Sequence, residues 1–224
     1  MKRLFTDIGL IAGKDLKIES RSRVLTNQVA PFALMILVLF GIALDADQQS
    51  LRNFASGLFW ISVLLCSLMA ISRSMTIERD DDALAGLSLS GVDPIAIFLG
   101  KTCAIAIQLL VLEIFLGLGI VLLYRSEIED LWLLVSTGLF ACIAISALGT
   151  IFGFLASGLG VRETLLPILL LPLLLPVLIG ATRAFDDALG VAAVNGWNWF
   201  AFVAGLTIIL TGVGAGANYL MAEN

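Results

Sequence analysis

The sequence predicts an all-α polytopic membrane protein formed by one permease domain, residues 1–224. Hydrophobic residues occupy 59% of the 224 positions and charged residues only 14%, against ~25% charged residues in an average soluble domain. Mean hydropathy is +1.03. The apolar residues gather in runs near the ~20 residues that a helix needs to cross the hydrocarbon core. Within these residues, little is left from which a soluble catalytic domain could be built.

Residues 1–26 predict an amphipathic helix that lies on the membrane surface. Projected at ~100° per residue, the basic side chains fall in one arc and the apolar side chains in the opposite arc. A basic face of this kind binds anionic lipid headgroups, so membrane lipid is an expected partner. Asp15 and Glu19 fall on the apolar side, where they either face a protein partner or mark a frayed part of the helix.

Apolar runs after this helix predict six transmembrane spans, the first of them the shortest. The spans are expected at 28–45, 54–73, 95–124, 131–157, 164–183 and 197–221. The linker 184–196 is rich in Ala and Val, which predicts a short re-entrant or interfacial helix before the last span.

The distribution of Lys and Arg predicts the orientation of the chain. If the amino terminus is cytosolic, ten of the 13 basic residues lie in cytosolic segments or their flanks. Only Arg52, Arg125 and Arg183 then lie outside, which agrees with the positive-inside rule. Both termini are therefore expected in the cytosol.

The longest polar interruption between spans contains the segment 77–91, which predicts a cytosolic coupling helix between spans 2 and 3. Acidic residues in its first turn match the helix dipole, and Leu84 and Leu87 offer an apolar edge. Asp93 and Pro94 then predict the start of the third span, as an N-cap followed by a preset first turn. A solvated connecting loop is the alternative interpretation of this segment.

The sequence lacks the residues that metal binding, haem ligation and ATP binding commonly use. The chain has no His, and His is the commonest metal ligand and haem axial ligand. The cysteines, Cys66, Cys103 and Cys142, are isolated within apolar runs and are interpreted as small core residues. No Walker A pattern is present. We therefore expect no catalytic residue, no metal and no cofactor bound by the chain itself, and an energy source on another subunit.

Glu113 is the sharpest functional candidate inside the membrane. It lies well within the third span, where an ionisable group is costly and usually functional. It could pair with a basic group across the bundle, form a helix–helix hydrogen bond in its protonated form, or line a substrate path. Lys101, two turns after Pro94, is expected to extend its ammonium group back to the cytosol.

The fifth span carries a second set of candidates for gating. It begins with Arg162 and Glu163, and Glu163 is well placed for the helix dipole. Pro167 fits the first turn, but Pro172 and Pro176 each remove a backbone hydrogen bond and predict kinks. Because freed carbonyls at membrane depth are tolerated only against protein or a wet cavity, the span is expected to face the bundle interior.

Two stretches resemble the haem exporter protein B (CcmB) family. They are the segment from Glu78 to Lys101, with the sequence ERDDDALAGLSLSGVDP at its start, and the segment from Arg162 to Val177, with the sequence RETLLPILLLPLLLPV. The length, the spans and the amphipathic start also match, so the resemblance covers nearly the whole chain. Asp82, Ala85 and Gly91 depart from the family pattern, which puts the detailed contacts of the loop in doubt.

The resemblance implies an ABC-2-type exporter-like subunit of the cytochrome c maturation complex, a multi-pass protein of the bacterial inner membrane. ATP would bind a CcmA-type ATPase partner, and haem is a possible substrate. A CcmC-type haem-handling protein, a small CcmD-type subunit and a homodimer are further implied partners, and no nucleic acid is expected. The ATPase would dock on Glu78, Arg79, Asp81, Leu84 and Leu87.

Several functions remain open at this point. The chain is expected to couple ATP hydrolysis by the partner to haem export or to release of a haem-loaded chaperone. The alternatives are a permease for another small or lipidic substrate and a non-transporting scaffold. The chain shows no tryptophan-rich haem motif, since its densest cluster is Trp197-Asn198-Trp199.

Overall fold

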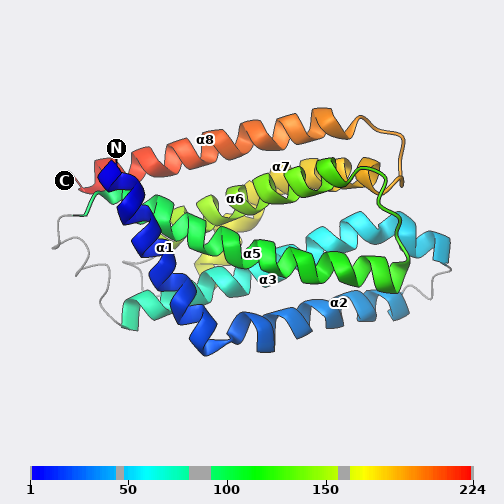
Figure 1. Ribbon diagram of the computed structural model, residues 1–224, viewed down its shortest axis with the longest axis horizontal. Coiled ribbons are helices and arrows are strands. Elements are labelled where there is room, and N and C mark those ends of the chain that lie inside the picture. The colour runs from blue at the N-terminus through cyan, green and yellow to red at the C-terminus, as the bar shows by residue number, and fades with distance from the viewer. Residues whose placement is uncertain (1, 44–47, 81–91, 156–161, 223–224) are drawn as a thin grey trace.

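The computed structural model describes residues 2–43, 48–80, 92–155 and 162–222, and every regular element within these ranges is helical. The predicted all-α class is confirmed. Figure 1 shows long helices that run side by side, with the amino and carboxyl termini at the same end of the molecule. The elements are α1 (Lys2–Ser22), the π-helical turn η1 (Leu25–Val29), α2 (Ala30–Ala43), α3 (Gln48–Asp80), α5 (Pro94–Tyr124), α6 (Leu131–Leu155), α7 (Arg162–Ala188) and α8 (Gly196–Ala222).

Among the described residues, five helices are long and apolar enough to cross a membrane by themselves, and a sixth span depends on how the amino-terminal helices are counted. The five are Gln48–Ser74, Pro94–Tyr124, Leu131–Leu155, Leu169–Ala188 and Gly196–Leu220. The expected first span corresponds to α2, whose 14 residues extend about 21 Å. The region passes as a span only when Asn27–Ala43 is counted together with Leu4–Ser22. These two helices are bent by 53° relative to each other.

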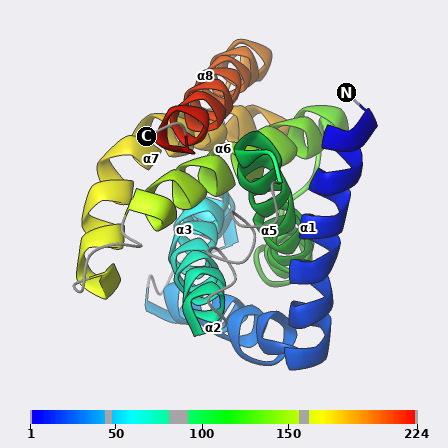
Figure 2. The ribbon, with the colours of Figure 1, turned by 90° about the vertical axis from the view of Figure 1, so that its left-hand side faces the viewer.

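Helix α5 lies at the centre of the bundle, packed against α1, α2, α3, α6 and α8. Its start agrees with the prediction, because Asp93 Oδ1 accepts a hydrogen bond of 2.9 Å from the Ile95 amide and Pro94 opens the first turn. At its other end, the Tyr124 hydroxyl donates to the Leu37 carbonyl of α2 over 2.7 Å. Figure 2 shows α1 crossing one side of α5. The central helix is therefore fixed at both ends.

An aromatic cluster joins α3 to the end of α7. Phe185 lies 5.0 Å from both Phe59 and Trp60 between ring centroids. The Ser56 hydroxyl donates to Asp186 beside this cluster. Tilted and edge-on ring pairs of this kind contribute beyond the area they bury. They fix α7 against α3 at the end of the bundle where α7 meets its following loop.

The expected re-entrant helix at 184–196 is wrong. Residues 184–188 continue α7, and Gly190 then adopts a left-handed conformation, with φ of +63°. The Val191 amide donates back to the Asp186 carbonyl over 2.8 Å, while Asp187 accepts from the Gly196 amide over 3.0 Å. A glycine in this conformation ends a helix, and these hydrogen bonds satisfy a compact turn. Ala and Val in this linker therefore belong to the end of α7 and to the turn.

We predict that Gly100→Val loosens the packing of α1 on α5. A Cβ atom at Gly100 would lie 2.8 Å from the Ile11 Cβ and 3.1 Å from the Ile8 carbonyl oxygen. Overpacking of this kind costs about 1–3 kcal/mol. The variant should unfold at lower temperature, and trypsin should cleave faster after Arg21. Gly117→Val is the matched control on the same helix, since a Cβ at Gly117 meets nothing within 4 Å. Equal stability of the two variants would contradict the packing described here.

Candidate functional site

Helix α1 is two-sided, and its apolar side packs on the rest of the chain. Ile11 and Ala12 are buried, whereas Lys17 and Arg21 are exposed. Ile11 lies directly on Gly100, at the first turns of α5. The amphipathic helix expected from the sequence is present, and α5 covers part of its apolar arc.

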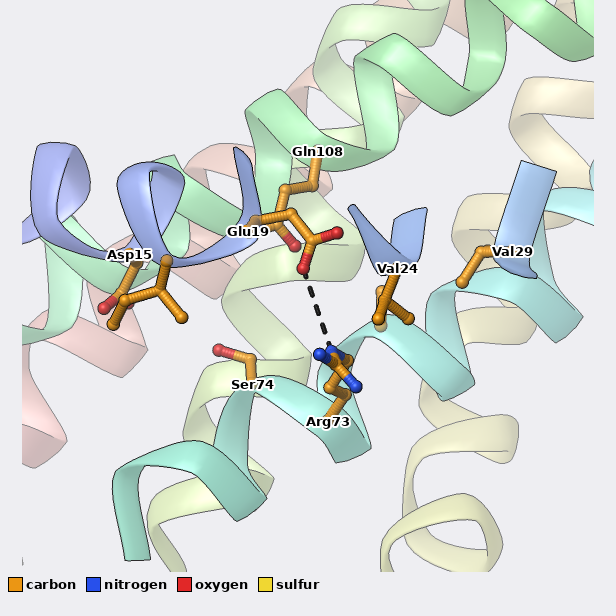
Figure 3. A pocket seen from close by; sticks show the side chains of 9 residues that line it. Asp15, Glu19, Val24, Val29, Arg73, Ser74 and Gln108 are labelled. Carbon is orange, nitrogen blue, oxygen red and sulfur yellow. Dashed lines mark ion pairs between the residues drawn. The ribbon is translucent and has the colours of Figure 1, made fainter. Parts of the chain in front are cut away.

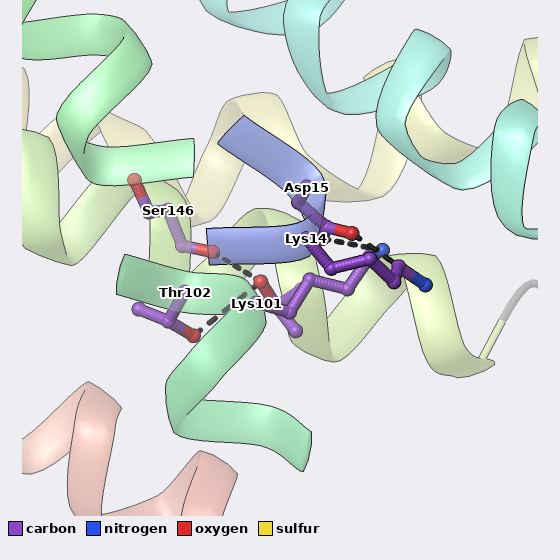
Figure 4. A network of polar contacts seen from close by, with 6 residues as sticks. Lys14, Asp15, Lys101, Thr102 and Ser146 are labelled. Atoms are coloured by element: carbon purple, nitrogen blue, oxygen red, sulfur yellow. Dashed lines mark hydrogen bonds and ion pairs between the residues drawn. The ribbon is translucent and has the colours of Figure 1, made fainter. Parts of the chain in front are cut away.

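A buried ion pair joins α1 to α5. Lys101 Nζ lies 3.4 Å from Asp15 Oδ2, and the two side chains are 2% and 12% exposed. Lys14 approaches the same carboxylate at 3.7 Å from the outside. Figure 4 shows these side chains converging between the two helices. The expectation that Lys101 extends to the cytosol is wrong, because its ammonium group finds an anion within the protein, where pairing offsets the cost of burial.

A second ion pair joins α1 to α3. Arg73 Nε lies 3.8 Å from Glu19 Oε2 (Figure 3), and the Glu19 side chain is 14% exposed. The pair borders a cavity of about 30 Å³ that is also lined by Gln108 and Ser74. That volume holds about one water molecule, so the cavity is too small for an organic substrate. We call Asp15, Glu19, Arg73 and Lys101 the α1 junction.

The α1 junction replaces both interpretations of Asp15 and Glu19 that the sequence left open. Helix α1 continues through Ser22, so neither residue lies in a frayed segment. Both carboxylates face basic residues of other helices in the same chain. Acidic residues on the apolar side of the projected helix indicate a buried polar contact. The projection does not identify the basic residues that they pair with.

Hydroxyl groups extend the polar contacts from α5 into α6. The Thr102 hydroxyl donates to Thr150 Oγ1 over 3.4 Å, and the Thr150 hydroxyl donates to the Ser146 carbonyl over 2.8 Å (Figure 4). All three residues are buried. Hydrogen bonds of this kind satisfy side chains that could not otherwise be buried. Movement at the start of α5 is thereby linked to α6 as well as to α1.

The predicted docking residues lie between the two basic residues of the junction in the sequence. Glu78 and Arg79 belong to the last turn of α3, where the structure describes only the backbone. Asp81, Leu84 and Leu87, like most of the segment 77–91, lie outside the described residues. Docking of a partner on this segment therefore stays a prediction.

Glu113 is buried at the contact of α5 with α6. Its side chain is 9% exposed, and a Cβ atom at Gly138 would lie 2.5 Å from its Oε2. The carboxyl oxygen Oε1 is buried and has no hydrogen-bond partner. Among the described residues Glu113 makes no ion pair, so no described side chain supplies the basic partner that one of the three alternatives requires. Hydrogen bonding between helices and contact with a substrate remain.

The proline-rich part of α7 does not face the bundle in the way expected. Leu170 and Leu174 are buried, but Pro172 and Pro176 lie on the exposed side of the helix. The apolar stripe determines which side is buried, because leucine has more to gain from packing. For Arg162, Glu163 and Pro167 the structure gives the backbone as the first turns of α7, and their gating role stays a prediction.

The cysteines and the other candidate ligands form no metal centre in the described part of the chain. Cys66 and Cys142 are buried and Cys103 is exposed, so the core position expected for all three is wrong for Cys103. No group of three or more His, Cys, Asp or Glu side chains that could hold a metal ion occurs among the described residues.

Comparison with known proteins shows the family. The model of the family described as CcmB protein matches residues 7–218. The chain belongs to the CcmB family. It is 33% identical to heme exporter protein B of Rhodobacter capsulatus, over 72% of this chain and 74% of that protein. It is 29% identical to heme exporter protein B of Haemophilus influenzae, over 80% of both chains. Heme exporter protein B of Pseudomonas aeruginosa is 28% identical over 84% of both chains.

Membership of the CcmB family indicates the class of activity. The chain is a non-catalytic, multi-pass membrane permease of the haem export and cytochrome c maturation system, and a component of an ABC exporter complex. The match spans both halves of the α1 junction, since Asp15, Glu19, Arg73 and Lys101 all lie within residues 7–218.

We predict that Asp15→Asn destabilises the packing of α1 by about 3 kcal/mol, because it removes the carboxylate that pairs with the buried Lys101 across the two helices. The double variant Asp15→Asn/Lys101→Met should recover most of that loss, since an apolar replacement for a buried pair is often nearly neutral. Thermal unfolding of the purified protein in detergent measures both.

The pair Arg52–Glu127 supplies a control for the double-mutant cycle at Asp15 and Lys101. Its atoms are 3.2 Å apart, but the Glu127 side chain is 77% exposed. An exposed pair contributes about 0–1 kcal/mol. A coupling energy at Asp15–Lys101 no larger than at Arg52–Glu127 would refute the buried pair as the anchor of α1.

Proposed function

We propose that this chain transmits the motion of a partner ATPase into the membrane, and so drives haem export or the release of a haem-loaded chaperone. One observation carries the proposal. Arg73 and Lys101 flank the segment 77–91 in the sequence, and both form ion pairs with α1. A partner that moves this segment would act on α3, α5 and α1 together, because the junction joins all three.

The partner is an ATPase subunit of the CcmA type. Support comes from the sequence, since the chain has no Walker A pattern and 77–91 carries an acidic start with an apolar edge at Leu84 and Leu87. A CcmC-type haem-handling protein, a small CcmD-type subunit and a second copy of this chain would complete the assembly. We propose no cofactor bound by this chain, with ATP on the partner.

We place the chain in the bacterial inner membrane with both termini in the cytosol. The basic residues support this orientation. The two termini lie at the same end of the bundle (Figure 1), as an even number of crossings requires. In this orientation the α1 junction lies near the cytosolic surface, where an ATPase would act.

Coupling without passage of haem is the mechanism that the junction supports best. The chain has no His, and the cavity at the junction has a volume of only about 30 Å³. Alternating access is the second candidate, supported by a groove of about 520 Å³ between α3 and α7, lined in part by Trp60, Arg183 and Asp186. This groove is large enough for a small molecule.

Variants in the segment 77–91 test the docking surface. We predict that Leu84→Asp or Leu87→Asp abolishes co-purification of the ATPase while the permease still inserts into the membrane, because each places a charge on the apolar edge. Ala85→Asp is the matched control, which adds the same charge away from that edge on the predicted helix and should retain the ATPase. Unchanged co-purification of both leucine variants would refute docking at this segment.

Reconstituted vesicles separate the two mechanisms. Vesicles that contain this chain and the ATPase alone should hydrolyse ATP without accumulating haem in the lumen. Haem in the lumen under these conditions would exclude the coupling-only mechanism. With the haem-handling partner and the chaperone added, the Asp15→Asn/Lys101→Met variant should hydrolyse ATP and release little chaperone. Normal release by this variant would refute the role of the junction.

A further inference from the structure

A groove of about 500 Å³ opens between α5 and α6, beside the loop that joins them. Its walls are apolar and come from both helices, with Leu118 and Leu139 on the exposed rim. Its floor reaches past these helices to Phe59 of α3 and Phe185 of α7. The volume is within the range of about 300–1,000 Å³ that small-molecule sites occupy.

Glu113 is the one polar side chain among the described residues that line this groove. Its Oε1 atom is buried and lacks a hydrogen-bond partner. On α6, the Thr137 hydroxyl, one residue before Gly138, is also buried without a partner. Because Glu113 lines the groove, its carboxyl group is within reach of a molecule bound there. An apolar groove with an unsatisfied acceptor in its wall is an incomplete site.

The position of Glu113 along α5 places this acceptor deep in the membrane. Tyr124 ends α5 eleven residues later (124 − 113), which corresponds to about 16 Å at 1.5 Å per residue. The hydrocarbon core is about 30 Å thick. Glu113 therefore lies near the middle of the core, where water does not compete for a hydrogen bond.

Glycine provides the space beside this carboxyl group. Gly117 follows Glu113 by one turn and lines the groove, and a Cβ atom there would meet nothing within 4 Å. Gly138 admits the carboxyl group itself, since a Cβ atom there would lie 2.5 Å from Oε2. Gly138 thus allows the Glu113 carboxyl group to pack against α6, and Gly117 leaves open space beside it.

We propose that the groove binds a lipid-soluble molecule that carries a hydrogen-bond donor, as a long-chain alcohol or amine does, with the donor on Glu113. The apolar body would lie along the walls toward Phe59 and Phe185, and the donor would satisfy the carboxyl oxygen. Entry is from the bilayer, because the rim residues face outward. This site is independent of the proposed coupling function, and it requires neither the ATPase nor the α1 junction.

The geometry disfavours other occupants. An anionic group would meet a carboxyl group, and a plain hydrocarbon would leave Oε1 without a partner. A helix is about 10 Å across with its side chains, so it would rest on the rim without its backbone reaching the floor at Phe59 and Phe185. A slim chain or a ring reaches both the floor and Glu113.

Photolabelling of the full chain in its native complex tests the site. The probes are hexadecanol, hexadecylamine, hexadecanesulfonate and hexadecane, each with a diazirine at the same carbon. The alcohol and the amine should label peptides from 110–121 and 128–139 saturably, in the absence of ATP. The sulfonate, which is permanently anionic and has no donor, and the hydrocarbon should label these peptides about tenfold less, as expected for loss of one hydrogen bond to a charged or strongly polar group.

Two variants and one control locate the binding. Gly117→Leu should fill the groove and abolish saturable labelling, while Gly205→Leu on α8, where a Cβ atom also meets nothing within 4 Å, should leave it unchanged. Glu113→Gln keeps an oxygen acceptor, so labelling by the alcohol should persist. Thermal unfolding shows whether the variants remain folded.

Three outcomes would overturn the proposal. Equal labelling by all four probes would show ordinary contact with lipid. Saturable labelling that survives Gly117→Leu in a folded protein would place the site elsewhere. Labelling of the isolated chain that is lost in the complex would show that a partner helix covers the groove. Failure of these tests leaves the coupling proposal standing, because its readouts are ATPase binding and chaperone release.

Discussion

The buried pair of Lys101 with Asp15 is the interaction on which the arrangement of the polar end of this protein depends. A lysine that is 2% exposed would be very costly without a nearby anion. Asp15 supplies that anion from α1, and the position of α1 follows from this requirement. Gly100 then allows Ile11 to approach α5 closely, so that charge and shape both select one docking position. The second pair, Glu19 with Arg73, ties the same helix to α3.

Helix α5 combines two tasks that impose different demands. Its first turns are held by charges and hydroxyl groups against α1 and α6. Its middle is apolar except at Gln108 and Glu113, and Glu113 rests over Gly138. Polar contacts fix direction and register, whereas apolar packing tolerates small shifts. The helix can therefore be positioned firmly at one end and still adjoin a groove farther along its length.

Much of the fold followed from hydropathy, because a membrane leaves few alternatives to helices of sufficient length. Asp93 and Pro94 also predicted the start of α5, since capping is a local property. The partners of Asp15 and Glu19 were not predictable, because a helical projection gives the direction of a side chain but not the identity of its neighbour. For the same reason a projection does not reveal that Lys101 turns inward to Asp15, that Pro172 faces away from the bundle, or which neighbour Glu113 meets. Composition alone does not reveal the hydrogen bonds around Gly190, so it does not predict where α7 ends.

The length of α3 has a mechanical consequence. Its 33 residues extend about 50 Å as one unbroken helix, while the hydrocarbon core is only about 30 Å thick. A displacement of the Asp80 end, as the proposed coupling requires, would be carried along α3 toward Gln48. Phe59 and Trp60 lie on that path, and their contacts with Phe185 would pass the motion to the end of α7 and the turn after it. In the proposed mechanism, the turn at 189–195 is therefore the place where a motion that begins at Asp80 reaches the opposite end of the bundle.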